Sequence, residues 1–198
     1  MKKLLISAAL AASLVPGAAI AQQAPAAVIV VVDSNRVANE CNACKTAAAA
    51  LRSQAAQVDA RATTLNNQLQ AEQKSIQDAI NALPKGTEPN AALQARAKAF
   101  QTKLAGADQE IGAARQRLQS TNLNILRQIK EKLDPAVRTV MTQRGANLVI
   151  DSENTASFAP GLDVTNQVIA QINTSLPSIS ATPLPQSARP PQQQPQGR

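Results

Sequence analysis

The chain has 198 residues and a formal net charge of +7, with no histidine, tyrosine or tryptophan and only two phenylalanines. Without histidine it lacks the commonest general base and metal ligand, so we expect no enzyme activity, no catalytic set, no cofactor and no metal site. The lack of aromatic stacking platforms argues against nucleic acid as a partner.

Residues 1–21 have the pattern of a secretory signal peptide. Lys2 and Lys3 form a basic start, and small residues precede Ala21. The apolar stretch between them, about 12 residues, is shorter than the ~20 that a membrane-spanning helix needs. We therefore expect cleavage between Ala21 and Gln22, export to the periplasm and no transmembrane anchor.

Residues 22–33 form an Ala/Pro/Gln lead-in followed by a strongly apolar run. Five β-branched residues in succession, Val28 to Val32, end at Asp33. Such a run is typical of a strand that is buried on both faces. Ser34 is the expected N-cap of the helix that follows.

Residues 34–144 carry apolar or small residues at steps of three and four in two successive runs. The main positions are Leu51, Ala55, Val58, Ala62, Leu65, Leu69, Ile76 and Leu83, then Leu93, Ala97, Phe100, Leu104, Ala107, Ile111, Ala114, Leu118 and Ile125. This spacing, sustained over several heptads, favours a coiled coil. Two prolines and a glycine interrupt it, which predicts an antiparallel helical hairpin with its tip near 84–90 and its base near 123–144, where the apolar face widens.

Cys41 and Cys44 form a CxxC motif inside the first helical run. In an exported protein this motif has three interpretations: a structural disulfide within or between chains, inert buried thiols, or a redox or metal function. Thioredoxin-type chemistry needs a βαβ context that is not indicated here. Zinc would need ligands that this chain lacks.

The basic residues are concentrated in the hairpin, since Lys45–Arg144 holds 15 basic and 8 acidic residues. One interpretation is a solvated coiled-coil face. The other is a field that attracts acidic chains or an anionic lipid or lipopolysaccharide surface. The candidate partner-facing residues on the second helix are Arg96, Lys98, Lys103, Arg115 and Arg117.

Residues 145–176 are expected to join residues 22–33 in a small β-rich body. Gly145 ends the helix, 147–151 and 155–158 are expected to form a strand hairpin, and Asp163 can cap a last amphipathic helix. Residues 177–198, rich in proline and glutamine, are expected to be a disordered tail. Because the body is small for an independent core, we expect oligomerisation.

The order of these segments resembles that of the Skp/OmpH family of periplasmic chaperones. The similarity lies in VIVVVD before the hairpin and in GANLVIDSENTASFAPGLDVTNQVIAQIN after it. The resemblance implies a homotrimer in which three subunits form a β-barrel body and three helical tentacles enclose a cavity. Cys41 and Cys44 and the proline-rich tail are not part of the family pattern.

The resemblance also implies an ATP-independent holdase that binds unfolded outer-membrane β-barrel proteins in this cavity and prevents their aggregation in transit. The alternatives are a periplasmic adaptor or structural protein whose coiled coil docks on a partner, and a thiol-redox protein that uses Cys41 and Cys44. These alternatives differ in their partners: many unfolded clients, one stable partner, or a dithiol substrate.

Overall fold

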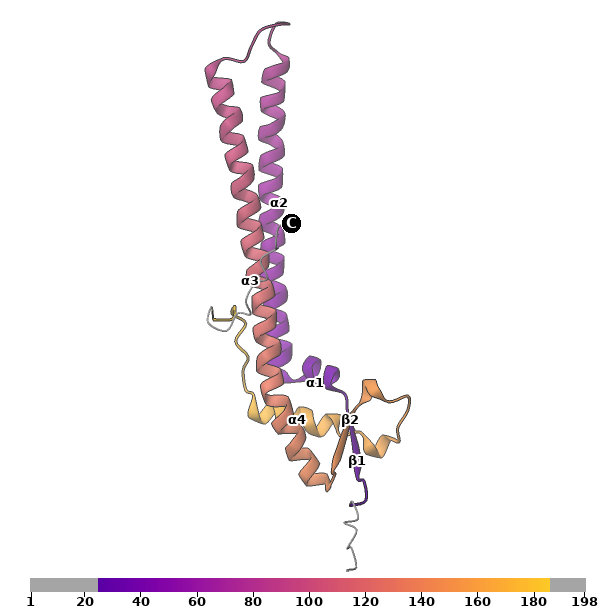
Figure 1. Ribbon diagram of the computed structural model, residues 1–198. Coiled ribbons are helices and arrows are strands. Elements are labelled where there is room, and N and C mark those ends of the chain that lie inside the picture. The colour runs from indigo at the N-terminus through magenta and orange to yellow at the C-terminus, as the bar shows by residue number, and fades with distance from the viewer. Residues whose placement is uncertain (1–24, 186–198) are drawn as a thin grey trace, which may run out of the picture.

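The computed structural model describes residues 25–185; the expected signal peptide, the cleavage site at Ala21 and Gln22, and residues 186–198 lie outside this range. The chain is mostly helical with a small sheet, in agreement with the expected α+β class (Figure 1). The elements in order are β1 (Ile29–Val32), α1 (Ser34–Glu40), α2 (Asn42–Asn81), α3 (Ala91–Arg144), β2 (Leu148–Asp151), the 3₁₀ helices η1 (Ser152–Asn154) and η2 (Pro160–Leu162), and α4 (Thr165–Ser175).

The two long helices, α2 and α3, run antiparallel and are joined by a turn (Figure 1). Gly86 adopts a positive φ of 85° in this turn, which glycine does at little cost. The side-chain oxygen of Asn90 caps α3 by accepting a hydrogen bond from the Leu93 amide at 2.9 Å. At about 1.5 Å per residue, the 54 residues of α3 extend over roughly 80 Å. We call residues 48–122 the arm.

The arm is packed with few buried side chains. Between residues 48 and 119 only Ile76, Phe100 and Ala107 are buried, and Leu104 remains 37% exposed. Because hydrophobic stabilisation scales with the apolar area removed from water, this part of the hairpin is held together only weakly. The helices also diverge toward the turn in Figure 1.

The main core lies at the opposite end of the molecule, where α1, α4, β1 and the last turns of α3 meet. We call these elements, with β2 and the start of α2, the base. The core cluster contains Val30, Val32, Val37, Cys41, Ala43, Cys44, Ala47, Ile125, Ile129, Ala136, Val140, Val164, Val168, Ile172 and Leu176. The wide apolar face predicted for 123–144 therefore supplies core residues, although Leu123 and Leu126 on the same stretch stay exposed.

The sheet differs from the expected strand hairpin. β2 pairs with β1, and the pairing is parallel, with Ile29 opposite Leu148 and Val32 opposite Asp151. Parallel strands need a long crossover, and here the whole arm is that crossover. Residues 155–158 form no strand, so that expectation is wrong; the other edge of β1 meets only an isolated bridge from Val31 to Asp163.

The first helical run is divided at Cys41, which separates α1 from α2. Asp33, and not Ser34, is the N-cap of α1, and its carboxylate accepts a hydrogen bond from the Arg36 amide at 2.8 Å. α3 continues through Pro135 and ends at Gly145, whose φ of 63° is left-handed.

Residues 177–185 contradict the expectation of disorder from Pro177 onward. They leave α4 and run as an extended segment along the arm, with Leu184 buried against it (Figure 1). We call residues 177–185 the strap. Composition did not predict this, because hydrogen bonds from the long helices fix a segment that is too short and polar to build its own core.

Candidate functional site

The five candidate basic residues all lie on α3 with exposed side chains. Arg96 donates a hydrogen bond to the Ser75 hydroxyl at 3.0 Å, and Lys103 forms an ion pair with Glu72 at 2.7 Å, so both are turned toward α2. Within residues 25–185, Lys98 and Arg115 form no ion pair. Arg117 lines a pocket between the helices.

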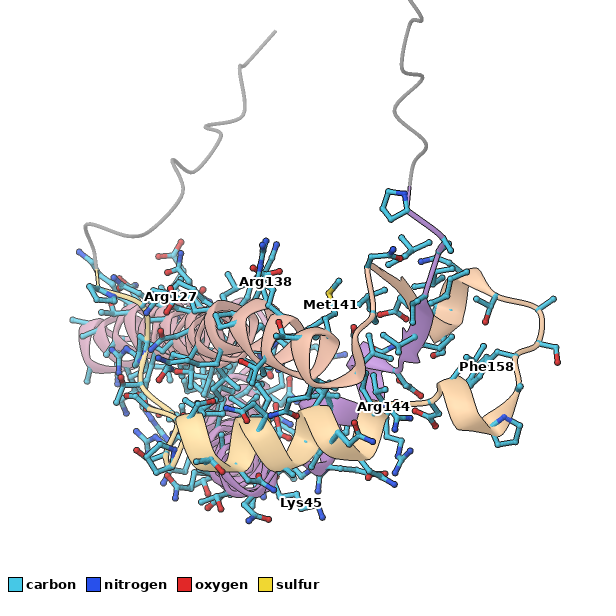
Figure 2. All side chains as sticks on the ribbon, turned by 90° about the horizontal axis from the view of Figure 1, so that it is seen from below. Lys45, Arg127, Arg138, Met141, Arg144 and Phe158 are labelled. Atoms are coloured by element: carbon cyan, nitrogen blue, oxygen red, sulfur yellow. A yellow bond between two sulfur atoms is a disulfide. The ribbon has the colours of Figure 1, made fainter. Side chains whose placement is uncertain are left out.

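Further basic side chains occupy the surface of the base. Figure 2 shows Arg138 on the side of α3 opposite α4, and Phe158 in the loop that stands away from the helices. Arg127 and Arg138 bind carboxylates on their own helix, at 2.6 Å to Glu131 and 2.9 Å to Asp134. Such exposed pairs one turn apart contribute little to stability.

A bidentate ion pair joins the two helices in the middle of the arm. Arg61 donates to the two carboxylate oxygens of Glu110 at 2.7 and 3.1 Å. The hydrogen bond from Arg61 lowers the pKa of Glu110, and the same contact raises the pKa of Arg61. Since the folded-state pKa of Glu110 is depressed, its contribution is present at neutral pH and is lost only as the pH falls through that lowered pKa.

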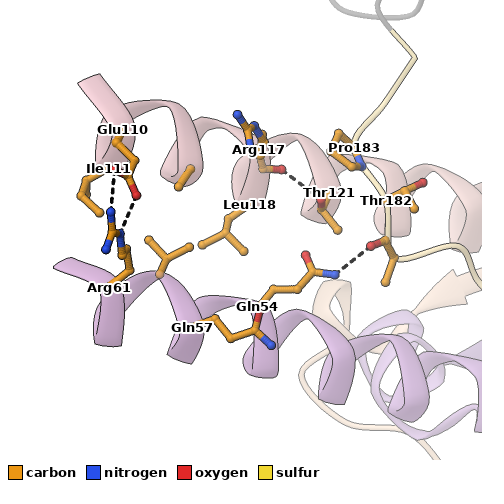
Figure 3. Close-up of a pocket in the computed structure, with 13 residues that line it drawn as sticks. Gln54, Gln57, Arg61, Glu110, Ile111, Arg117, Leu118, Thr121, Thr182 and Pro183 are labelled. Carbon is orange, nitrogen blue, oxygen red and sulfur yellow. Dashed lines mark hydrogen bonds and ion pairs between the residues drawn. The ribbon is translucent and has the colours of Figure 1, made fainter. Parts of the chain in front are cut away.

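The main chain of the strap is hydrogen-bonded to side chains of α2 and α3. Gln54 donates to the carbonyl of Ala181 at 2.9 Å (Figure 3). Asn124 donates to the carbonyl of Thr182 at 3.0 Å. Gln128 makes two bonds, donating to the Ser180 carbonyl and accepting from the Ser180 amide, each at 3.0 Å.

A fifth bond, from the Leu184 amide to the Ser120 hydroxyl at 3.0 Å, fixes the far end of the strap. Leu184 is itself buried. All five bonds therefore join side chains of the helices to peptide groups of the strap.

A pocket of about 410 Å³ lies between α2 and α3 beside the strap. Figure 3 shows the strap at one end of it and the Arg61–Glu110 pair at the other. Its apolar lining includes Val58, Ile111 and Leu118. The two helices and the strap thus form a groove with an occupied half and an open half.

Sequence reasoning missed this groove, although a signal was present. Ser120, Asn124 and Gln128 are spaced by four residues and therefore lie on one face of α3. Ser120 and Asn124 are also buried. A polar stripe beside an apolar face requires hydrogen-bond partners when it is covered, and these partners come from residues more than fifty positions away.

Cys41 and Cys44 are joined by a disulfide at the junction of α1 and α2. The Cys41 sulfur also accepts a hydrogen bond from the Cys44 amide and caps α2. The two residues are only 0% and 2% exposed. A substrate dithiol cannot reach sulfurs buried to this degree, so the geometry disfavours thiol exchange with a partner.

Replacing Cys41 and Cys44 together by alanine is expected to lower the free energy of unfolding by about 2 kcal/mol, the loop-entropy value for so short a ring. Urea unfolding of the two proteins measures the difference. Wild-type protein unfolded with excess reductant is the control and should match the variant. An unchanged midpoint under both conditions would contradict a stabilising role.

Among residues 25–185 no helix is long and apolar enough to cross a membrane. The same residues contain no group of three or more Cys, Asp or Glu side chains that could hold a metal ion.

The fold defines the class of protein: a long helical arm on a small base of two parallel strands and short helices. The chain belongs to the OmpH-like outer membrane protein family, whose model matches residues 28–172. This is the Skp/OmpH family that the sequence resembles, and membership supports a chaperone role in a family that is generally non-enzymatic.

Among solved structures, the chain is similar to a candidate outer membrane chaperone (OmpH-like) from Caulobacter crescentus. The TM-score is 0.68 at 17% sequence identity, over 81% of this chain and 93% of that chain. At this identity the similarity supports the shared fold. Comparison with curated proteins gives no match.

Proposed function

We propose that this protein is an ATP-independent periplasmic holdase, which binds unfolded outer-membrane β-barrel proteins between helical arms and keeps them from aggregating. The observation that carries the proposal is the arm itself: a long antiparallel helix pair that projects from the base and buries few of its own side chains. Family membership supports a chaperone role and a periplasmic location.

Uncompensated positive charge on the arm is the second support. Lys98 and Arg115 are exposed and lack ion-pair partners among the described residues, so their charge acts outward. An outward positive field speeds encounter with acidic chains. The same charges would also attract an anionic lipid or lipopolysaccharide surface.

A homotrimer is the proposed assembly, with the strands of three subunits closing a β-barrel. Two short strands are marginal as an isolated sheet, and β2 has no second neighbour among the described elements. Leu123, Leu126 and Leu148 are large apolar side chains that remain 44%, 50% and 44% exposed at the base. Contact between subunits there would cover them and would leave the arms to enclose a cavity.

Dilution of a urea-unfolded outer-membrane β-barrel protein into buffer tests the function. We expect one trimer per client to suppress light scattering, with the same suppression whether or not ATP is added. Serum albumin at equal mass controls for non-specific coating. Scattering equal to that of the albumin control would end the holdase proposal.

Client capture is also expected to slow with added salt. Exposed charges are screened over a Debye length of ~10 Å at 0.1 M and ~3 Å at 1 M ionic strength, so the electrostatic part of the encounter should fade across this range. Stopped-flow fluorescence with an acidic client should give an association rate at least about tenfold lower at 1 M. A rate that does not change with salt would contradict the role of the arm charges.

A further inference from the structure

The groove between α2 and α3 binds the strap through the main chain of the strap. Four polar side chains of the groove, Gln54, Ser120, Asn124 and Gln128, each bond to a peptide amide or carbonyl of the strap. In this segment only the Leu184 side chain is buried. Because peptide groups are common to every protein, such contacts carry little sequence information.

Gln128 illustrates the chemistry. Its side-chain amide has the same donor and acceptor as a peptide group, and it uses both on Ser180, as a neighbouring strand would. The prolines at 183 and 185 restrict the strap to extended conformations. The strap therefore resembles a short extended peptide added to the surface of a helix pair.

Among residues 25–185, the groove is longer than the segment that fills it. Beyond Thr182 and Pro183 the pocket continues between α2 and α3, where Val58, Ile111 and Leu118 offer apolar contact. This open part would accommodate small and medium apolar side chains of a longer ligand. Arg61 and Arg117 lie at its rim.

We infer that this groove is a binding site for extended segments of unfolded polypeptide, and that the strap is its displaceable occupant in the same chain. The natural ligand rests on the proposed holdase function, since an unfolded client supplies extended main chain. A client segment would replace the strap by making the same bonds to Gln54, Ser120, Asn124 and Gln128. The strap would thereby compete with clients for the groove.

The probe is a fluorescent synthetic peptide with the sequence of residues 177–185. A tethered segment has an effective concentration of order 1 mM, so a strap that occupies its groove implies that the free peptide binds the empty groove with Kd below about 1 mM. The chain that ends at Leu176 should bind it. The chain that ends at Pro185 keeps the strap and should bind at least about twofold more weakly, because the strap fills the groove for more than half of the time.

Three further proteins and one further peptide sharpen the test. Full-length Leu184→Asp changes one residue and puts a carboxylate in place of the one buried side chain of the strap, so it should loosen the strap and bind the peptide more tightly than the chain that ends at Pro185, even if the shortened chain folds poorly. In the chain ending at Leu176, Gln128→Ala should weaken binding at least about fivefold, the equivalent of one lost hydrogen bond. Gln77→Ala, on the arm away from the groove, should leave binding unchanged. A peptide in which Ser178, Ser180 and Thr182 are replaced by alanine keeps the main chain, the leucine and the prolines, and should bind within a few-fold of the original.

Failure of the peptide to bind Leu184→Asp, when the circular dichroism of that variant is unchanged, would overturn the inference and leave the strap a fixed structural segment. Strong preference for the original over the alanine-substituted peptide would also overturn main-chain recognition. Peptide binding is measured without any aggregation assay. If the peptide binds but the protein does not suppress aggregation, the holdase proposal is wrong and the peptide-binding groove still stands.

Discussion

Replacing Ile172 by alanine is expected to lower the free energy of unfolding by about 2–5 kcal/mol, the range for truncating a buried aliphatic side chain. Ile172 is 0% exposed and belongs to the core cluster that joins α4 to β1, α1 and α3. Since a domain of ordinary stability has only 5–15 kcal/mol in total, this one change should bring the base close to unfolding. Urea titration followed by far-ultraviolet circular dichroism measures the loss.

Ile80→Ala is the matched control, because the same side-chain atoms are removed from a partly exposed position on the arm. Its expected loss is below about 1 kcal/mol, since little apolar area leaves water there. Equal losses for the two variants would contradict a fold in which stability is concentrated in the base.

Leu148→Asp is expected to dissociate the proposed trimer at micromolar concentration. Leu148 lies on β2, is exposed in the single chain and would be covered by a neighbouring subunit. A carboxylate buried there without a partner costs several kcal/mol, and a closed trimer would contain three such sites. Native mass spectrometry measures the subunit number directly.

Leu104→Asp introduces the same charge at a comparably exposed leucine on the arm, far along the chain from the base. It should leave the subunit number unchanged. Dissociation by both variants, or by neither, would argue against subunit contacts at β2.

The helices of the arm were accessible to sequence reasoning because their signals are local. Apolar residues recur every three or four positions, two prolines interrupt the pattern, and Gly145 follows the last helical residue. The break at Cys41 was not apparent, because no proline or glycine stands near it to interrupt the helical run. There the structure has a disulfide and a new N-cap.

The sheet was harder because strand pairing is decided by distant residues. Residues 155–158 have a plausible strand composition, but they do not pair with β1. Val31 instead forms a single bridge with Asp163, and the carbonyl of Val31 accepts a hydrogen bond from the Val164 amide at 2.9 Å. β1 and β2 lie more than a hundred positions apart, so their parallel register depends on the arm returning the chain to its start.

The strap shows the limit of composition as a guide. A segment rich in proline, serine and threonine cannot bury a core of its own, which made disorder the expectation. Side chains at Gln54, Asn124 and Gln128 supply the missing interactions. Only a search for partners of the polar stripe on α3 would have found them.

Small-angle X-ray scattering combined with a mass measurement on the processed protein would decide whether several subunits join through their bases and project their arms from one particle. We predict three copies per particle, an elongated outline and scattering from a hollow interior. A particle with the mass of one subunit, or a filled compact shape with no space for a guest chain, would contradict it.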